Sequence, residues 1–80
     1  MTETKTVTLS DGSEHTVTVF QCRFARLQEF EPRAMNYNAR TFRDQTIYTH
    51  ILLEHPTPTL YHGETEEDAL AGMDADLTNV

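Results

Sequence analysis

The sequence has one cysteine, Cys22, so no disulfide can form within the chain. It has no apolar run near the ~20 residues that a helix needs to cross a bilayer, and it shows no charged-then-apolar leader. We therefore expect a soluble, cytoplasmic protein. A single domain of 80 residues (1–80) buries only about 60–65% of the surface that its unfolded chain exposes, which makes its stability marginal.

Cations are absent from the second half of the chain. All six Lys and Arg residues lie within residues 1–43, where five acids leave a charge of +1, whereas residues 44–80 carry eight acids and neither Lys nor Arg. The stretch YHGETEEDALAGMDADL, residues 61–77, alone holds six of the carboxylates. With a net charge of −7, this asymmetry concerns partners and solubility rather than fold.

Two alternating segments are the clearest local signal. In TKTVTLSDGSEHTVTVF, threonines alternate with aliphatic residues on both sides of Asp11-Gly12. β-Branched residues with a period of two suit a half-buried strand, and Asp-Gly favours a tight hairpin because glycine accepts a positive φ. The pattern predicts strands at about 4–10 and from residue 14 onward.

The aromatic segment that follows permits two interpretations. Phe20, Phe24, Leu27 and Phe30 have helical spacing. However, TVTVFQCRFARL contains no Gly, Pro, Asp, Asn or Ser that would turn the chain from a strand into a helix. We favour one strand over 14–27. A β-bulge near Phe20 would change which alternate residues of this strand face the core.

Residues 28–45 are predicted to form a long loop, because Pro32 ends the preceding element and no sustained period follows. Arginines and aromatic residues alternate across 23–43, a composition that suits phosphate contact and base stacking. The candidate nucleic-acid contacts are Arg33, Tyr37, Arg40 and Arg43. Because the net charge is −7, we favour pairing of these arginines with acids of the same chain or of a second copy.

The segments TIYTHILLEH and TLYH predict a second hairpin, with strands at 46–54 and 59–62. A register that sets Leu53 opposite Leu60 keeps the aliphatic face continuous. The same register sets Leu52 opposite Tyr61.

An aromatic face is expected on this second hairpin. The sheet face away from the helix would carry Tyr48, His50, Leu52 and Tyr61. It is more aromatic than a solvated face requires, so we expect it to bind a partner, and a homodimer that buries it would supply the core that a small monomer lacks.

The acidic run begins as a helix. Thr65 suits the N-cap position, and Asp68 can reach back to its N–H in a short capping box. Glu66, Glu67 and Asp68 would occupy the first turn, where carboxylates stabilise the positive end of the helix dipole. We predict a helix over 66–77, with a frayed end at 78–80.

Asp74 and Asp76 are not explained by helix formation. They approach the negative end of the helix dipole, where a cation is preferred. Either they mark a solvated terminus or they face a partner with basic groups, so they are candidate partner contacts.

No residue set indicates catalysis or a metal site. His50, His55 and His62 lack the spacing of zinc ligands, and the predicted register places His50 and His62 on opposite faces. Cys22 within a strand is typical of a small buried side chain. Three glycines in the whole chain leave no phosphate-binding loop. We expect a protein that is not an enzyme and binds no cofactor.

The C-terminal third, IYTHILLEHPTPTLYHGETEEDALAGMDADL, resembles the ending of small uncharacterised proteins of bacteriophages that infect actinobacteria. The likeness covers about 46–75, where a strand, a turn and a strand lead into a helix that opens with threonine and acids. Met73 stands where those proteins usually have histidine. The resemblance implies a phage-encoded accessory protein.

The sequence as a whole predicts an α+β fold, in which an antiparallel sheet of about four strands carries one C-terminal helix on one face. Our first functional hypothesis is an accessory protein that binds another protein, of the host or the phage, and inhibits a host factor. The second is an acidic mimic of nucleic acid that blocks a host or defence protein. The third is a nucleic-acid-binding module that uses 23–43.

Overall fold

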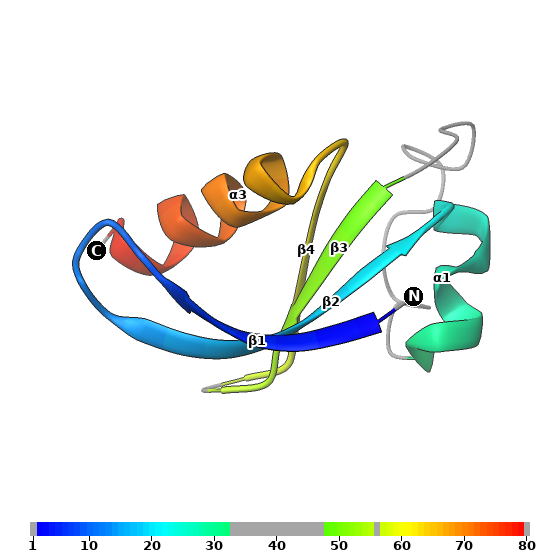
Figure 1. Ribbon diagram of the computed structural model, residues 1–80, viewed down its shortest axis with the longest axis horizontal. Coiled ribbons are helices and arrows are strands. Elements are labelled where there is room, and N and C mark those ends of the chain that lie inside the picture. Colours follow the sequence, from blue (N-terminus) through cyan, green and yellow to red (C-terminus); the bar gives the residue numbers. More distant parts are fainter. Residues whose placement is uncertain (1, 33–47, 56, 80) are drawn as a thin grey trace.

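The computed structural model describes residues 2–32, 48–55 and 57–79 (Figure 1). They form a four-stranded antiparallel sheet in the order β1-β2-β3-β4, together with a C-terminal helix. The predicted α+β fold is therefore confirmed. The strands are β1 (Thr2–Thr8), β2 (Glu14–Cys22), β3 (Tyr48–Leu53) and β4 (Thr59–Gly63), and the helices are α1 (Phe24–Phe30) and α3 (Glu66–Thr78).

The hairpin of β1 and β2 follows from the alternation in its sequence. Val7 and Val17 are buried, whereas the threonines between the aliphatic residues lie on the other face. In the turn, the Leu9 N–H donates to the Ser13 carbonyl at 2.9 Å, and the Gly12 N–H donates to the Leu9 carbonyl at 3.0 Å. Gly12 has a φ of 86°, which glycine adopts without a Cβ clash.

One face of the sheet is covered by α3 (Figure 1). Ala69 and Met73 are its buried residues, and Leu70 and Leu77 are partly buried. They pack on aliphatic side chains that the strands direct to this face. The resulting core cluster comprises Val7, Leu9, Val17, Val19, Ile51, Leu53, Ala69 and Met73.

The start of α3 confirms the N-cap role predicted for Thr65. Its backbone is extended, and its hydroxyl accepts a hydrogen bond from the Asp68 N–H at 3.2 Å. Within the part of the chain that the structure describes, the Asp68 carboxylate does not bond back to the Thr65 N–H, so half of the capping box is formed. The helix continues through Thr78, one residue beyond the predicted end.

The interpretation of 14–27 as one strand is wrong beyond Cys22. The chain leaves β2 at Arg23, whose φ of −63° and ψ of 145° are extended, and enters α1 without a side-chain cap. The pairing of β2 with both neighbours is continuous, so the described strands contain no bulge near Phe20. The sequence shows no Gly, Pro, Asp, Asn or Ser between β2 and α1 because Arg23, in an ordinary extended conformation, makes the turn.

Packing explains why α1 forms. Leu27 is fully buried, at 0% exposure, and it belongs to a second core cluster with Phe20, Leu52 and Leu60. A helix of seven residues has little stability of its own in water, so this tertiary contact holds it. The predicted loop over 28–45 begins later than expected because residues 28–30 belong to α1, and residues 33–45 lie outside the described residues.

The register of the second hairpin differs by one residue from the prediction. Leu52 pairs with Leu60 and Leu53 pairs with Thr59, where Leu53 opposite Leu60 was expected. A shift of one residue exchanges the faces of a strand. The observed register places Leu52 and Leu60 beneath α1, whereas Ile51 and Tyr61 lie beneath α3. Because helices cover parts of both faces, both faces need apolar residues.

Candidate functional site

The aromatic face predicted as a partner surface is not formed. His50 and Leu52 are buried, at 0% and 4% exposure, and Leu52 packs with Leu27. Tyr61 lies on the opposite face of the sheet, among the residues under α3. The side chain of Tyr48 lies outside what the structure describes. Near Leu52, Leu27 of α1 covers the sheet.

Tertiary hydrogen bonds account for Asp74 and Asp76. One carboxylate oxygen of Asp74 accepts bonds from both the N–H and the hydroxyl of Ser10, each at 3.0 Å. The Asp76 carboxylate accepts a bond from the Tyr61 hydroxyl at 2.6 Å. The two acids therefore tie α3 to the turn between β1 and β2 and to β4. The residues that local helix chemistry leaves unexplained are anchors of the helix on the sheet.

Replacing Asp74 by Ala is expected to lower the free energy of unfolding by about 1 kcal/mol, because Ser10 loses an acceptor shared by two exposed hydrogen bonds. Urea unfolding of Asp74→Ala, Ser10→Ala and the double variant measures the coupling between the two residues. Strictly additive losses would contradict the contact.

His50 and His62 lie together, which corrects their predicted placement on opposite faces. They pair across β3 and β4, and their rings stack with centroids 6.4 Å apart and planes 13° from parallel. The His50 Nε2 lies 3.2 Å from the Cys22 carbonyl oxygen. Because a carbonyl oxygen only accepts, Nε2 carries the proton in this bond.

Burial keeps these histidines neutral. It is the main cause that lowers the pKa of His50 to about 4, with His62 as a smaller one, and it also lowers the pKa of His62. Burial raises the pKa of the Cys22 thiol, whereas a nucleophilic cysteine needs a lowered pKa. His50 contacts the backbone oxygen of Cys22, so the pair lacks the arrangement of an activated nucleophile and its base.

Across residues 2–32, 48–55 and 57–79, no three side chains of His, Cys, Asp or Glu are grouped so that they could hold a metal ion. In the same ranges, no helix combines the length and apolar character needed to span a membrane. The candidate nucleic-acid residues Arg33, Tyr37, Arg40 and Arg43 lie outside the described residues.

The main candidate site is a groove on the sheet face opposite α3, which we call the threonine groove. On β2, Thr16 and Thr18 share this face with Phe20, and α1 packs at the Phe20 end. The other half of the face is hollowed into a groove of about 480 Å³. Its lining comes from β1, β2 and the end of β3: Thr4, Glu14, His15, Thr16, Val17, Thr18, Leu52, Leu53, Glu54 and His55.

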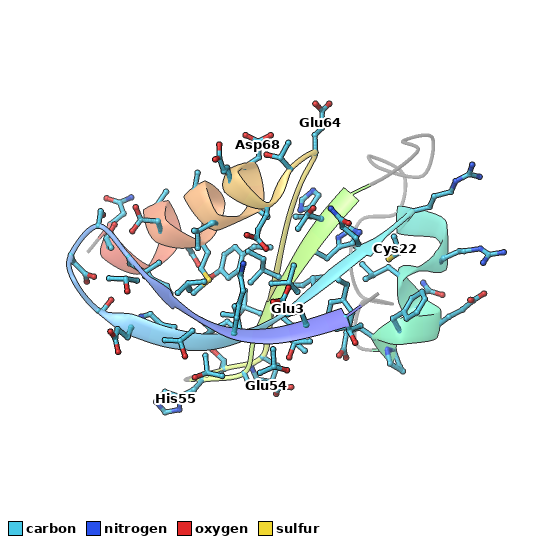
Figure 2. All side chains as sticks on the ribbon, viewed as in Figure 1. Glu3, Cys22, Glu54, His55, Glu64 and Asp68 are labelled. Carbon is cyan, nitrogen blue, oxygen red and sulfur yellow. The ribbon has the colours of Figure 1, made fainter. Side chains whose placement is uncertain are left out.

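The threonine groove is acidic and open. Glu14 and Glu54 line it, and among residues 2–32, 48–55 and 57–79 no Lys or Arg does. The side chains of Thr4, Thr16, Glu14 and Glu54 are exposed. Figure 2 shows Glu54 at the end of the second hairpin, on the side of the molecule away from Glu64 and Asp68 at the start of α3. The groove and the acidic start of α3 are therefore separate negative surfaces.

Part of this site was accessible from the sequence. The period of two already separates Thr16 and Thr18 from the buried Val17, and a helix on one face predicts that the threonines face away from it. What could not be foreseen is that Glu54 lies beside them, because that depends on the pairing of β2 with β3.

Comparisons with known proteins give no family assignment: no family model, curated protein or solved structure matches the chain. The likeness to phage proteins stays a prediction.

Proposed function

We propose that this protein acts without catalysis, by binding another protein whose contact surface is basic, and that it does so through the threonine groove. The observation that carries the proposal is the composition of the groove: its described lining holds two carboxylates, Glu14 and Glu54, on an open face of the sheet. A lysine or arginine of the partner would meet opposite charge there.

The groove is better suited to a protein chain than to a small molecule. Pockets for small molecules bury most of their ligand, whereas five of the ten described residues that line this groove are exposed. The threonines offer methyl groups and hydroxyls side by side, so they can contact both the apolar and the polar parts of an extended segment.

The strength of the interaction follows from the exposure of its charges. Ion pairs between exposed groups contribute about 0.2–1 kcal/mol each and are screened by salt. We therefore expect a reversible complex that weakens as the ionic strength rises. Such a complex would serve a phage-encoded accessory protein, as the resemblance implies, and inhibition of a host factor is the role that we propose for it.

The mimicry hypothesis now depends on a different set of acids. Asp74 and Asp76 are engaged within the chain, so a nucleic-acid mimic would have to use the exposed Glu64, Glu67 and Asp68. These side chains belong to the first turn of α3 and the residues just before it, where acids also serve helix formation. We favour the threonine groove because Glu14 and Glu54 lie in or beside strands, outside any helix start.

A basic peptide tests the proposal. The probe is a twelve-residue peptide of alternating Lys and Thr, titrated into ¹⁵N-labelled protein at low and at physiological salt. We expect saturable shift changes at Thr4, Thr16 and Thr18. The Glu14→Gln/Glu54→Gln double variant should bind about tenfold more weakly, which corresponds to about 1.4 kcal/mol for two exposed pairs.

The matched control is Glu64→Gln/Glu67→Gln, which changes the net charge equally at α3 and should alter the affinity less than twofold. An equal loss in the control would overturn the assignment to the groove and support mimicry through α3. Binding of a single-stranded RNA oligonucleotide in place of the peptide would support the nucleic-acid hypothesis instead.

A further inference from the structure

Thr49, on β3, has a buried hydroxyl that forms no hydrogen bond with any described residue. The residue is 1% exposed, and its Oγ1 is among the few buried polar side-chain atoms without a partner. Burial of a hydroxyl without a hydrogen bond costs free energy, and native proteins nearly always avoid it. A bound ligand that forms a hydrogen bond with the Thr49 hydroxyl would remove this cost.

Thr49 is one of the residues that line a small pocket, which we call the Thr49 pocket. The pocket has a volume of about 130 Å³ and is lined by Thr2, Glu3, Val19, Gln21, Thr49 and Glu66. The strand register places Glu3, Val19, Gln21 and Thr49 on the face that α3 covers. Glu66 is the first residue of α3, so the pocket lies on the sheet beside the start of that helix.

The polar groups of the pocket accept hydrogen bonds from a cation. Glu3 and Glu66 supply carboxylates, and the Thr49 hydroxyl oxygen can accept as well. An alkylammonium group has three N–H donors, one for each of these acceptors. A guanidinium presents its five donors in a rigid planar fork, whereas an ammonium is a compact charge, which suits a pocket of about 130 Å³.

Lys5 shows that an ammonium already binds at the edge of this pocket. Its Nζ donates to a carboxylate oxygen of Glu66 at 2.7 Å, and the two side chains are 33% and 42% exposed. Exposed ion pairs of this kind contribute little to stability, so a second ammonium can displace Lys5 from Glu66 at small cost. Lys5 therefore acts as a competitor held within the chain.

We propose that the Thr49 pocket binds a primary alkylammonium group, held by Glu3, Glu66 and the Thr49 hydroxyl, with Lys5 displaced from Glu66. Both a free small amine and a lysine side chain of a partner protein carry this group. The site lies on the opposite sheet face from the threonine groove. The proposal for one site can therefore be contradicted while the proposal for the other stands.

The first experiment is a titration of ¹⁵N-labelled protein with n-butylammonium at constant ionic strength. We expect saturable shifts at Gln21, Thr49 and Glu66, with a dissociation constant on the order of 1–10 mM, as suits a ligand of few atoms. n-Butylguanidinium should bind at least fivefold more weakly. The absence of saturable shifts up to 100 mM, or equal binding of the two cations, would overturn the proposal.

Variants at Thr49 separate binding from structure. Thr49→Val keeps the shape and removes the hydroxyl, so it should weaken n-butylammonium binding at least fivefold while raising the melting temperature. Thr49→Ser keeps the hydroxyl and should retain binding within twofold. A lower melting temperature for Thr49→Val, with unchanged affinity, would mean that only ordered water bonds to the hydroxyl. That result would contradict the proposal.

Charge variants test the acceptors and the competitor. Glu3→Gln should weaken binding several-fold, whereas Glu64→Gln makes the same charge change outside the pocket and should leave it unchanged. Lys5→Met should tighten binding several-fold, because Glu66 is released. A short peptide with one central lysine then distinguishes the sources: tighter binding than n-butylammonium identifies a partner side chain, and weaker binding identifies a free amine.

Discussion

Acidification from pH 7 to pH 4 is expected to lower the free energy of unfolding by roughly 2–3 kcal/mol through His50 alone. The folded chain holds the pKa of this fully buried histidine at about 4, against an ordinary value of 6.5. Between these values the unfolded chain binds a proton that the folded chain does not. The stability is therefore full above about pH 6.5 and falls progressively towards pH 4.

The loss is large for a domain of this size. At about 0.05–0.15 kcal/mol per residue, the whole chain is stabilised by only about 4–12 kcal/mol. His62, stacked on His50, has its pKa lowered in the same direction. Its protonation adds to the loss as the pH falls below 6.5, and two adjacent imidazolium ions would repel each other.

Urea unfolding followed between pH 4 and pH 8 measures this effect. The variant His50→Leu places an aliphatic side chain beside Phe20, its partner across β2 and β3, and it should remove the part of the loss between pH 6.5 and pH 4 that His50 causes, leaving the part due to His62. His55→Gln, at an exposed side chain, is the control and should keep the wild-type profile. A wild-type stability that stays constant from pH 7 to pH 4.5 would contradict the buried neutral histidine.

Gly63→Ala is expected to lower the free energy of unfolding by about 2–3 kcal/mol, as overpacking of a dense contact does. Gly63 ends β4, and a Cβ there would lie 2.6 Å from the Ala69 backbone nitrogen and 2.6 Å from the Asp68 Cβ. These atoms cannot rotate away, so the start of α3 must move. The shift would disturb the packing of Ala69 and Met73, which are both fully buried.

Gly72→Ala is the matched control for this prediction. A Cβ at Gly72 meets no atom within 4 Å, and the residue is exposed in the middle of α3. Alanine there should raise the free energy of unfolding by about 0.5–1 kcal/mol, because it has the higher helix propensity. If the two variants shift the urea midpoint in the same direction, the close approach of β4 and α3 is not as described.

The two predictions test the element contacts that distinguish this fold from its local sequence signals. The His50 variant tests the packing on the face covered by α1, and the Gly63 variant tests the junction of β4 with α3. The sequence pattern placed His50 on an exposed face and gave Gly63 no role. Their importance follows from the register of the second hairpin, which the sequence interpretation misplaced by one residue.

The sequence by itself determined the elements whose causes are local. Alternating threonines and valines, with Gly12 in the turn, specify the first hairpin, because the pattern and the turn chemistry act within a few residues. Thr65 followed by three acids specifies the start of α3 for the same reason. From these signals the α+β class and the exposed threonine face could be predicted.

Tertiary structure alone decided the remaining features. The helix α1, the pairing of His50 with His62, and the bonds of Asp74 to Ser10 depend on residues far apart in the chain. For Phe20 to Phe30, local signals allow either a strand or a helix, and burial of Leu27 selects the helix. Likewise, Asp74 is unfavourable for its own helix end but is stabilised by the turn that folds against it.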